Sequence, residues 1–313
     1  MFLLDPEIFF WDIAILSMMA FGLTINFICF FWIKKHCAAP FAKRFFLGFL
    51  GFLGLLGFLT VAYGSFIEPQ IITITQHSIT LPATNELRIV VLSDFHVGPY
   101  KDAAFVRRVV QRVNMLYPDL ILLTGDFIYG KTSQTSDLLP LGDLRASLGI
   151  FAVTGNHDAG QSLSFLRQPI KNEDRRAEIM DMFEGMDIPV LHNEHRIVTL
   201  PNGSLAIAGI TDLWTGEADI ERALNGIEPT TPTILLSHNP DVVLHEESHT
   251  ADLIVSGHAH GGQIRLPFQK MFSIDTKLTK TLQLAITRGV GESLARARLF
   301  AWPEILVLDV NSM

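Results

Sequence analysis

Two long apolar segments open the chain. Residues 13–33 and residues 45–67 carry no charged side chain, and each reaches the roughly 20 residues that a helix needs to cross a bilayer. Two buried core helices in tandem are the alternative, but a body of this size would hardly cover both. The pattern therefore predicts a membrane anchor in residues 1–67 that contains two transmembrane helices.

Glycine recurs at every third position in the second apolar segment, from Gly48 to Gly57. Small residues let helices approach closely in lipid, but the usual spacing of such residues is four. We therefore expect compositional bias rather than a dimer interface, and the sequence predicts no oligomeric state.

From residue 87 onward the pattern changes to short apolar runs separated by polar helical stretches. Buried strands are predicted at residues 87–93, 119–124, 150–154, 233–236 and 252–256. Helices are predicted at residues 104–117, 137–148, 175–186 and 240–248. The Asn202-Gly203 turn predicts a hairpin of residues 196–200 with 204–210, and further strands are predicted at 282–288 and 298–310. Strands that alternate with helices, followed by antiparallel strands, indicate a layered α/β sandwich in one domain, residues 68–313.

Composition separates the same two regions. The anchor holds 14 of the 23 phenylalanines but only three acidic and four basic residues, whereas the body holds 29 acidic and 20 basic residues. An acidic body argues against nucleic acid as a partner, because nucleic-acid binding needs a basic surface. Both cysteines, Cys29 and Cys37, lie in the anchor, so the body can contain neither a disulfide framework nor a cysteine-based zinc site.

The basic residues of the anchor gather between its two apolar segments. They are Lys34, Lys35, Lys43 and Arg44, with His36 beside them, and the next basic residue beyond the second segment is Arg88. The positive-inside rule therefore places this connector in the cytoplasm and the body on the extracytoplasmic side. Residues 42–47 resemble a twin-arginine export signal with Lys43 in place of the first arginine, so a retained anchor and an export signal both stay open. Residues 62–64 form a poor cleavage site, which favours the anchor.

Five predicted strands end in side chains that can bind metal ions. These side chains are Asp94 and His96, Asp126, Asn156 with His157 and Asp158, His238, and His258 with His260. Sites of α/β sheets lie at the carboxyl ends of the strands, and residues i and i+2 of an extended segment point to the same side. One such motif is common by chance, but five in order are not. The sequence therefore predicts a single metal site assembled from five segments.

The order of these motifs, D-x-H, G-D, G-N-H-D, H and G-H-x-H, resembles that of the calcineurin-like metallophosphoesterases over about residues 87–263. The resemblance implies a four-layer α/β/β/α sandwich with a two-metal site between its sheets. It implies one metal ion held by Asp94, His96 and His260, another held by Asn156, His238 and His258, and Asp126 as the bridge between them. Oxygen and imidazole ligands suit Mn²⁺, Fe or Zn²⁺ and leave the choice among them open.

A dinuclear centre of this kind predicts hydrolysis of a phosphodiester or pyrophosphate bond. Two divalent ions can produce a bridging hydroxide at neutral pH and bind the phosphate oxygens during in-line attack. His157 is predicted to donate to the phosphate or the leaving oxygen, and Asp158 is predicted to orient His157. The alternative is a catalytically silent, membrane-anchored metal-binding or scaffolding module. An enzyme that has lost its activity would be expected to have lost a metal ligand, and none is missing from this sequence.

The anchor adds a clue to the substrate. The anchored chain resembles the membrane-attached bacterial branch of the family, which includes enzymes similar to UDP-2,3-diacylglucosamine pyrophosphatases. This resemblance implies a bacterial inner-membrane location and a lipid-linked substrate. UDP-sugars are cytoplasmic, however, whereas the charge pattern places the body outside. We therefore expect a phosphoesterase in the broad sense, with the UDP-lipid as the specific hypothesis.

Several other features of the body are weaker candidates. Residues 159–176 and 266–278 are candidate loops at the edge of a substrate cleft. Candidate contacts to an anionic substrate in or beside the first loop are Arg167, Arg175 and Arg176, although solvated charge is the simpler interpretation. The backbone of residues 261–263 is expected to turn tightly and could touch phosphate. The expected surface histidines are His192, His195, His245 and His249.

Overall fold

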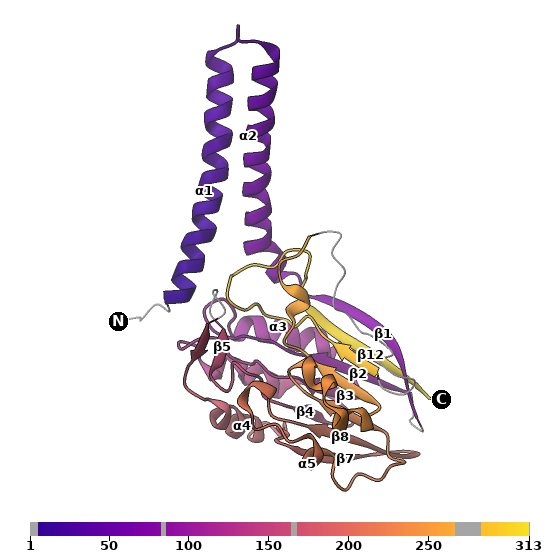
Figure 1. Cartoon of the computed structure of the whole chain (residues 1–313). Helices are drawn as coiled ribbons and strands as arrows, with labels where there is room; N and C mark the ends of the chain where they lie inside the picture. The colour runs from indigo at the N-terminus through magenta and orange to yellow at the C-terminus, as the bar shows by residue number, and fades with distance from the viewer. Residues whose placement is uncertain (1–5, 83–85, 164–167, 267–282, 313) are drawn as a thin grey trace.

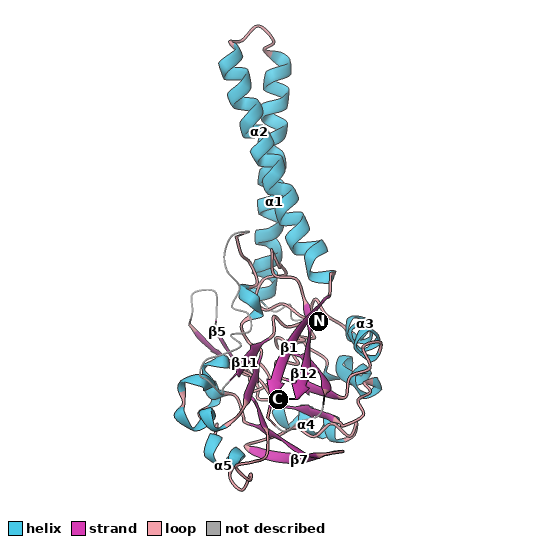
Figure 2. Ribbon diagram, turned by 90° about the vertical axis from the view of Figure 1, so that its right-hand side faces the viewer, coloured by secondary structure: helices cyan, strands magenta, loops and turns pink. Residues whose placement is uncertain are grey.

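The computed structural model of the chain describes residues 6–82, 86–163, 168–266 and 283–312. Two long helices, α1 (Pro6–Lys35) and α2 (Phe41–Ala62), lie side by side as a stalk on a body that contains the β-sheets (Figures 1 and 2). The helix α1 begins beside the body, and the connection between the two helices forms the far tip of the stalk (Figure 1).

The stalk has the length and composition of a membrane hairpin. Its apolar segments Phe9–Lys35 and Phe41–Gln70 are each long enough to cross a bilayer, and both are longer than the predicted segments. Large side chains point outward, so that Phe21 is 68% exposed and Phe45 is 66% exposed. Because so much exposed apolar surface is unfavourable in water, these helices are suited to lipid rather than to a soluble core.

Glycine lines the contact between the two helices. A Cβ atom on Gly22 would lie 2.6 Å from the carbonyl oxygen of Gly54, so only glycine fits there without a shift of the backbone. The side-chain amide of Asn26 donates a hydrogen bond to the carbonyl of Gly51 at 2.9 Å. The glycines therefore let α1 and α2 pack closely within one chain. The expectation of compositional bias alone is wrong for Gly51 and Gly54.

The second helix is joined firmly to the body. It continues through a π-helical turn (Tyr63–Ile67) and a 3₁₀ turn (Glu68–Gln70). The carbonyl of Gly64 accepts a hydrogen bond from the backbone N–H of Arg298 at 2.8 Å. The buried carboxylate of Glu68 accepts one from the N–H of Ala301 at 2.8 Å. Stalk and body therefore meet through hydrogen bonds rather than through a free linker.

The first sheet has five strands in the order β1-β12-β2-β3-β4. Its members are β1 (Thr73–Leu81), β2 (Leu87–Leu92), β3 (Leu120–Leu123), β4 (Ile150–Ala152) and β12 (Glu304–Ser312). The strands β2, β3 and β4 run parallel, whereas β12 runs antiparallel to β2. The helix α3 (Ala103–Asn114) connects β2 to β3 and begins after Asp102, whose carboxylate accepts a hydrogen bond from the N–H of Phe105.

The second sheet has the order β11-β10-β9-β8-β7. Its members are β7 (Glu194–Leu200), β8 (Gly203–Gly209), β9 (Thr233–Leu236), β10 (Leu253–Ser256) and β11 (Gln283–Ile286). The strands β7 and β8 form the predicted hairpin, and β8, β9, β10 and β11 run parallel. The remaining elements are a small hairpin of β5 (Gln161–Leu163) with β6 (Pro169–Lys171), and the helices α4 (Arg176–Glu184) and α5 (Ile220–Leu224).

Three apolar cores separate four layers of secondary structure. Successive residues of a strand point to opposite faces, so Ile89 of β2 packs between the two sheets while Val90 joins the core shared with α3 and α4. On the outer face of the second sheet, Leu235 packs in a third core with Ile220 of α5. The arrangement is the predicted α/β/β/α sandwich.

Two predicted helices are wrong. Residues 137–148 contain a 3₁₀ turn (Thr135–Asp143) with Pro140 inside it, and proline cannot continue a helix because it lacks an N–H group. Residues 240–248 form two 3₁₀ turns, Pro240–Leu244 and Glu246–Thr250, separated by the extended residue His245.

The strand predicted at residues 298–310 begins only at Glu304. Before it, the backbone of Leu299 pairs with Gln263 and Arg265 instead of continuing the sheet. The strands β1, β5 and β6 are additional to the predicted elements.

Candidate metal centre

The candidate ligands lie where parallel strands end. Asp94, Asp126 and Asn156 follow β2, β3 and β4, and His238 and His258 follow β9 and β10. The carboxyl ends of parallel strands meet at one edge, so the two packed sheets bring these five segments together. Hydrogen bonds from the N–H of Asp94 to the carbonyl of Gly125 (2.9 Å), and from the N–H of Gly257 to the carbonyl of His238 (3.0 Å), tie neighbouring segments.

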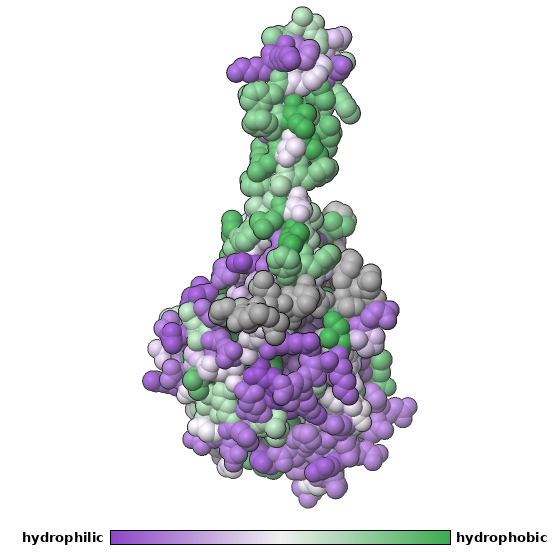
Figure 3. All heavy atoms as spheres, turned by 90° about the vertical axis from the view of Figure 1, so that its left-hand side faces the viewer, coloured by the Kyte–Doolittle hydropathy of each residue, from purple (hydrophilic) through white to green (hydrophobic). Residues whose placement is uncertain are grey.

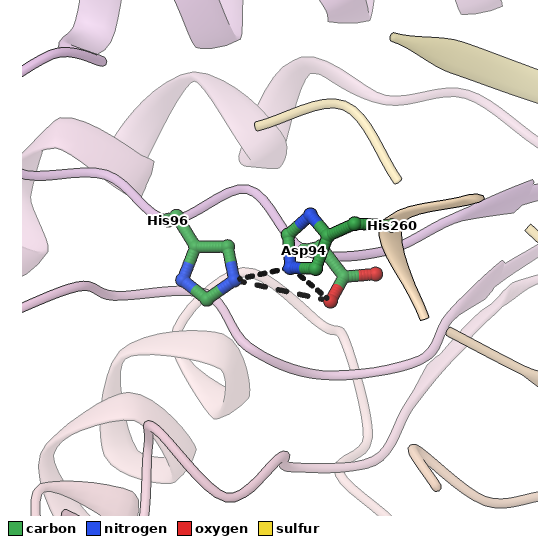
Figure 4. Close-up of side chains that lie close together, drawn as sticks. All are labelled: Asp94, His96 and His260. Carbon is green, nitrogen blue, oxygen red and sulfur yellow. Dashed lines mark hydrogen bonds and ion pairs between the residues drawn. The ribbon is translucent and has the colours of Figure 1, made fainter. Parts of the chain in front are cut away.

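The first cluster consists of Asp94, His96 and His260 (Figure 4). The Nε2 atoms of His96 and His260 are 3.1 Å apart, and they lie 3.8 Å and 3.3 Å from Oδ1 of Asp94. All three side chains are buried. Three atoms with lone pairs thus face one point, and a cation satisfies such an arrangement better than hydrogen bonds among them can.

The second cluster consists of Asp126, Asn156, His238 and His258. Nδ1 of His258 lies 3.0 Å from Oδ1 of Asn156 and 3.2 Å from Nε2 of His238. The amide of Asn156 donates to the carbonyl of Gln161 at 2.7 Å, which turns its oxygen toward the cluster. Nδ1 of His238 is 2.7 Å from the carbonyl of Thr124, so this nitrogen carries the proton and Nε2 faces the cluster.

Asp126 lies between the two clusters. Its Oδ2 atom is 3.5 Å from Nε2 of His96 in the first cluster and 3.1 Å from Nε2 of His238 in the second. Its Oδ1 atom accepts a hydrogen bond from the N–H of His157 at 2.8 Å, which fixes the carboxylate. The position is the one that a bridging ligand would occupy.

The pKa values of the histidines suit metal binding. Burial lowers the pKa of His96 to about 3 and that of His258 to about 4, and it lowers the pKa of His260 well below its usual value. Neutral imidazoles, which are the form that binds metals, are therefore present at pH 7. Burial acts in the same direction on His238, but the charge of Asp126 outweighs it and raises the pKa of His238 well above its usual value. A metal ion at this point would displace that proton.

The backbone at the candidate ligands is strained. Asp94, His96, Asp126, His258 and His260 all have positive φ, between 46° and 65°. Residues other than glycine seldom adopt this conformation, and such strain gathers at functional sites. Two glycines make room for the strained segments. A Cβ on Gly155 would lie 2.2 Å from Oδ1 of Asp126, and one on Gly257 would lie 2.7 Å from Oδ2 of Asp94.

His157 lies beside the first cluster. Its ring centre is 4.8 Å from that of His96, edge to face, and 5.2 Å from that of Tyr129. Burial lowers the pKa of His157, so its ring is neutral at pH 7 and offers one N–H group. The position allows His157 to donate a hydrogen bond to a group held between the clusters.

The carboxylate of Asp158 contacts backbone groups. It accepts hydrogen bonds from four backbone N–H groups at 2.8–3.2 Å, those of Asp126, Phe127, Ile128 and Gly155. Its predicted role in orienting His157 stays a prediction. Burial and the charge of Asp126 raise the pKa of Asp158 to about 7, while the N–H donors favour its anionic form. Asp158 therefore joins the backbone segments that carry Asp126 and Asn156.

The weaker candidates have other partners. Arg175 pairs with Glu178, and Arg176 pairs with Asp174 and Glu217, while Arg167 and residues 267–278 lie outside the described part of the chain. The turn at residues 260–262 forms as expected. The N–H groups of Gly262 and Gln263, which were candidates for contacting phosphate, donate instead to the carbonyls of Ala259 and His260.

The four histidines expected at the surface of the body belong to neither cluster. His245 and His249 share no helix, Nε2 of His249 contacts the carbonyl of Val243, and Nδ1 of His195 contacts that of Ala223. His192 and His195 are half-buried rather than exposed.

Two neighbours of the clusters were not predicted. The buried guanidinium of Arg298 lies 3.3 Å from both the carbonyl and Nδ1 of His260. The ring of Trp214 meets that of His258 edge to face, with ring centres 5.2 Å apart. Trp214 and the β5–β6 hairpin line a groove of about 520 Å³ beside the second cluster. Nothing local in the sequence marks either residue, because the contacts span tens of residues.

A larger cavity of about 930 Å³ lies elsewhere in the body. Its lining includes Thr233 and Asp252, at the amino ends of β9 and β10, and residues of α5. The candidate ligands lie at the opposite ends of these strands. The smaller groove is therefore the one that adjoins the candidate metal centre.

Comparisons with known proteins agree with this geometry. Residues 87–262 match the sequence model of the calcineurin-like phosphoesterases. The chain is 29% identical to the UDP-2,3-diacylglucosamine pyrophosphatase LpxG of Chlamydia trachomatis, over 79% of this chain and 84% of that protein. It is 28% identical to the phosphodiesterase YaeI of Escherichia coli, over 79% of this chain and 92% of that protein. A transmembrane protein with a metallophosphoesterase domain from Danio rerio is 35% identical, over 58% of this chain and 41% of that protein.

Proposed function

Because the chain belongs to the calcineurin-like phosphoesterase family, and is therefore a metal-dependent phosphoester hydrolase, we propose that it cleaves a phosphodiester or pyrophosphate bond of a lipid-linked substrate at a membrane surface. The observation that carries this proposal is the pair of ligand clusters that share Asp126, in a body bonded to an apolar stalk.

Two divalent cations fit the residues present. Asp94, His96 and His260 would hold one, Asn156, His238 and His258 would hold the other, and Asp126 would contact both. When bound, such ions activate water at neutral pH and neutralise charge on a phosphate group. Mn²⁺, Fe and Zn²⁺ all suit this set of oxygen and imidazole ligands.

The chain's own residues supply the remaining functions. His157 is held at the first cluster by the hydrogen bond from its N–H to Asp126, and its neutral ring donates to a phosphate or leaving oxygen. The groove between Trp214 and the β5–β6 hairpin lies next to His258 and takes the part of the substrate beyond the phosphate. An aromatic wall favours a flat or apolar group there.

The body lies on the extracytoplasmic face in this proposal. Lys34 and Lys35 end α1, and Lys43 and Arg44 begin α2, so the basic residues lie at the tip of the stalk opposite the body (Figure 1). The positive-inside rule then assigns the tip to the cytoplasm. Because α2 is bonded to the body at Gly64, a retained anchor is favoured over a cleaved export signal.

The relatives point to a substrate class rather than to one substrate. LpxG is named for hydrolysis of a lipid-linked pyrophosphate and YaeI for hydrolysis of a phosphodiester. An extracytoplasmic body would not meet a UDP-linked lipid, which is cytoplasmic. The side of the membrane therefore decides between UDP-2,3-diacylglucosamine and another lipid-linked phosphoester.

The test of the reaction uses the full-length protein in detergent with Mn²⁺, Zn²⁺ or Fe²⁺ and bis-p-nitrophenyl phosphate. We expect hydrolysis that EDTA abolishes and that Asp126→Asn lowers by more than about 100-fold, since a shared ligand matters more than an outer-shell partner. Asp143→Asn, which removes an exposed carboxylate, is the matched control and should retain activity. Absence of activity with every metal would favour the silent metal-binding module.

Reporter proteins fused to the C-terminus test on which side of the membrane the body lies. Alkaline phosphatase, which is active only outside the cytoplasm, should be active, and a cytoplasm-dependent fluorescent protein should be dark. The reverse result would place the body in the cytoplasm and make UDP-2,3-diacylglucosamine the first substrate to assay.

A further inference from the structure

Exposed apolar side chains gather where the body meets the stalk. We call this surface the apolar collar, and it consists of Phe66, Ile67, Ile264, Leu266, Phe300 and Trp302. Each of the six is between 37% and 58% exposed. Elsewhere in the described part of the body, large exposed apolar side chains such as Ile197 and Leu244 are scattered. Single exposed residues are ordinary, whereas a contiguous group indicates a binding surface.

Hydrogen bonds join the three segments of the collar. The N–H of Arg298 donates to the carbonyl of Gly64, and the indole N–H of Trp302 donates to the hydroxyl of Tyr63 at 3.3 Å. The N–H of Leu299 donates to the carbonyl of Gln263, and the N–H of Arg265 donates to the carbonyl of Leu299, both at 2.9 Å. The end of α2 and the segments around residues 264 and 300 therefore form one surface.

The collar continues the outer surface of the stalk. The residues of α2 that precede it are equally exposed, with Leu56 at 47% and Leu59 at 53%. Figure 3 shows the apolar surface of the stalk reaching down to the neck, above a body that is mostly polar on this face. Trp302 and Tyr63 are the residue types that prefer the boundary between lipid and water. This continuity makes the lipid of the same membrane the occupant of the collar.

The collar is also tied to the candidate metal centre. Ile264 follows the candidate ligand His260 by four residues. Arg298, which lies in the same segment as Phe300 and Trp302, contacts His260 through its buried guanidinium. Phe300 has a φ of 56°, unusual for an aromatic residue, so the segment holds an exposed aromatic ring despite backbone strain.

We propose that the apolar collar inserts into the lipid–water boundary and holds the edge of the body that carries His260 against the bilayer surface. A lipid-linked phosphoester could then reach the clusters while its acyl chains stay in the membrane. The membrane contact is independent of the reaction, whereas its use in substrate capture rests on the proposed function.

The contact is tested by lipid-borne quenching of a fluorophore in full-length protein reconstituted into vesicles of phosphatidylethanolamine and phosphatidylglycerol. In a background of Cys29→Ala and Cys37→Ser, Ile264→Cys and Ile197→Cys each carry an environment-sensitive label. Position 197 lies on β7, the edge strand far from the stalk (Figure 1). We expect spin-labelled lipid to quench position 264 strongly and position 197 little. Equal quenching of the labels at positions 264 and 197 would overturn the proposal. So would a label at position 264 that is buried but not quenched by lipid, which is the result expected if a second copy of this chain covers the collar.

The consequence for substrate capture is tested with Ile264→Asp and Phe300→Asp. Both variants should hydrolyse soluble bis-p-nitrophenyl phosphate within about two-fold of the wild type, and Ile197→Asp serves as the matched control. Against CDP-diacylglycerol embedded in the same vesicles, the two collar variants should lose about ten-fold in rate, because a charge replaces a buried apolar contact. Equal rates on the embedded substrate would overturn this role of the collar. The wild type could also hydrolyse the soluble ester but neither embedded lipid, CDP-diacylglycerol or UDP-2,3-diacylglucosamine. That result would contradict the lipid-linked function, whereas the membrane contact shown by quenching would still stand.

Discussion

In the stalk most of the large apolar side chains face outward, and glycine lines the contact between the helices. Phe21 and Phe45 are mostly exposed, whereas Gly51 and Gly54 are buried between the helices. In the body the relation is reversed, because all the side chains of β3 are buried and apolar while polar ligands gather at the strand ends. The difference is the one expected if the stalk faces lipid and the body faces water.

The two regions also differ in what their buried polar groups do. In the stalk Asn26 donates to a backbone carbonyl and closes a helix–helix contact. At the strand ends Asp94, Asp126 and the histidines converge on shared points and strain the backbone. Asn26 therefore contributes to packing in the stalk, whereas the side chains at the strand ends of the body form a candidate metal centre.

The largest expected effect concerns His157. If the strand ends serve chemistry, His157→Asn should lower kcat by about 10²- to 10⁴-fold, because the shorter amide cannot place an N–H group where the imidazole holds one and cannot act as a general acid. The melting temperature should stay unchanged, since the imidazole is not part of an apolar core. His249→Asn, at an exposed histidine, is the control for kcat. A normal kcat in His157→Asn would remove this residue from the reaction.

A substitution of Asp158 tests whether the strand ends of the body also contribute to the stability of the fold. Asp158→Asn replaces an acceptor of four backbone N–H groups by an amide that can satisfy only some of them, at a cost of about 1–3 kcal/mol. We expect a lower melting temperature in thermal unfolding of the detergent-solubilised protein, with a secondary loss of activity. A loss of kcat at an unchanged melting temperature would instead support the orienting role that the sequence predicts.

The smallest effect on activity is expected in the stalk. Gly22→Val places a side chain against the carbonyl of Gly54 and should cost about 1–3 kcal/mol of helix packing. Packing can be measured in Cys37→Ser protein as the rate of disulfide formation between Cys29 and Gly51→Cys, since a Cβ at position 51 would lie 3.2 Å from Cβ of Cys29. Gly22→Val should slow this cross-link and leave hydrolysis of the soluble ester intact. Gly57→Val is the control, because a Cβ at position 57 would meet no atom within 4 Å, and it should change neither the rate of the cross-link nor the rate of hydrolysis.

Much of the fold was predictable because its signals are local. The apolar segments of the stalk, the buried strands and the Asn202-Gly203 hairpin all follow from short-range patterns. The helices expected at 137–148 and 240–248 failed because proline and extended residues interrupt them, and no local pattern marked the edge strand β1 strongly. The residues of β1 up to Ser78 are half-buried or exposed, so this strand lacks the buried apolar run that marks the central strands.

By itself the sequence determined which residue types stand at the strand ends, and their order identified the chemistry. Only the tertiary structure decided how they combine. Asp126 contacts both clusters because two sheets pack face to face, and Asp158 binds backbone of the segment that follows β3, about thirty residues away. Arg298 reaches His260, and the collar assembles from three segments, through hydrogen bonds between loops distant in sequence. A residue's type and neighbours along the chain specify what it can bind, but its partners depend on contacts that form only when the whole chain is folded.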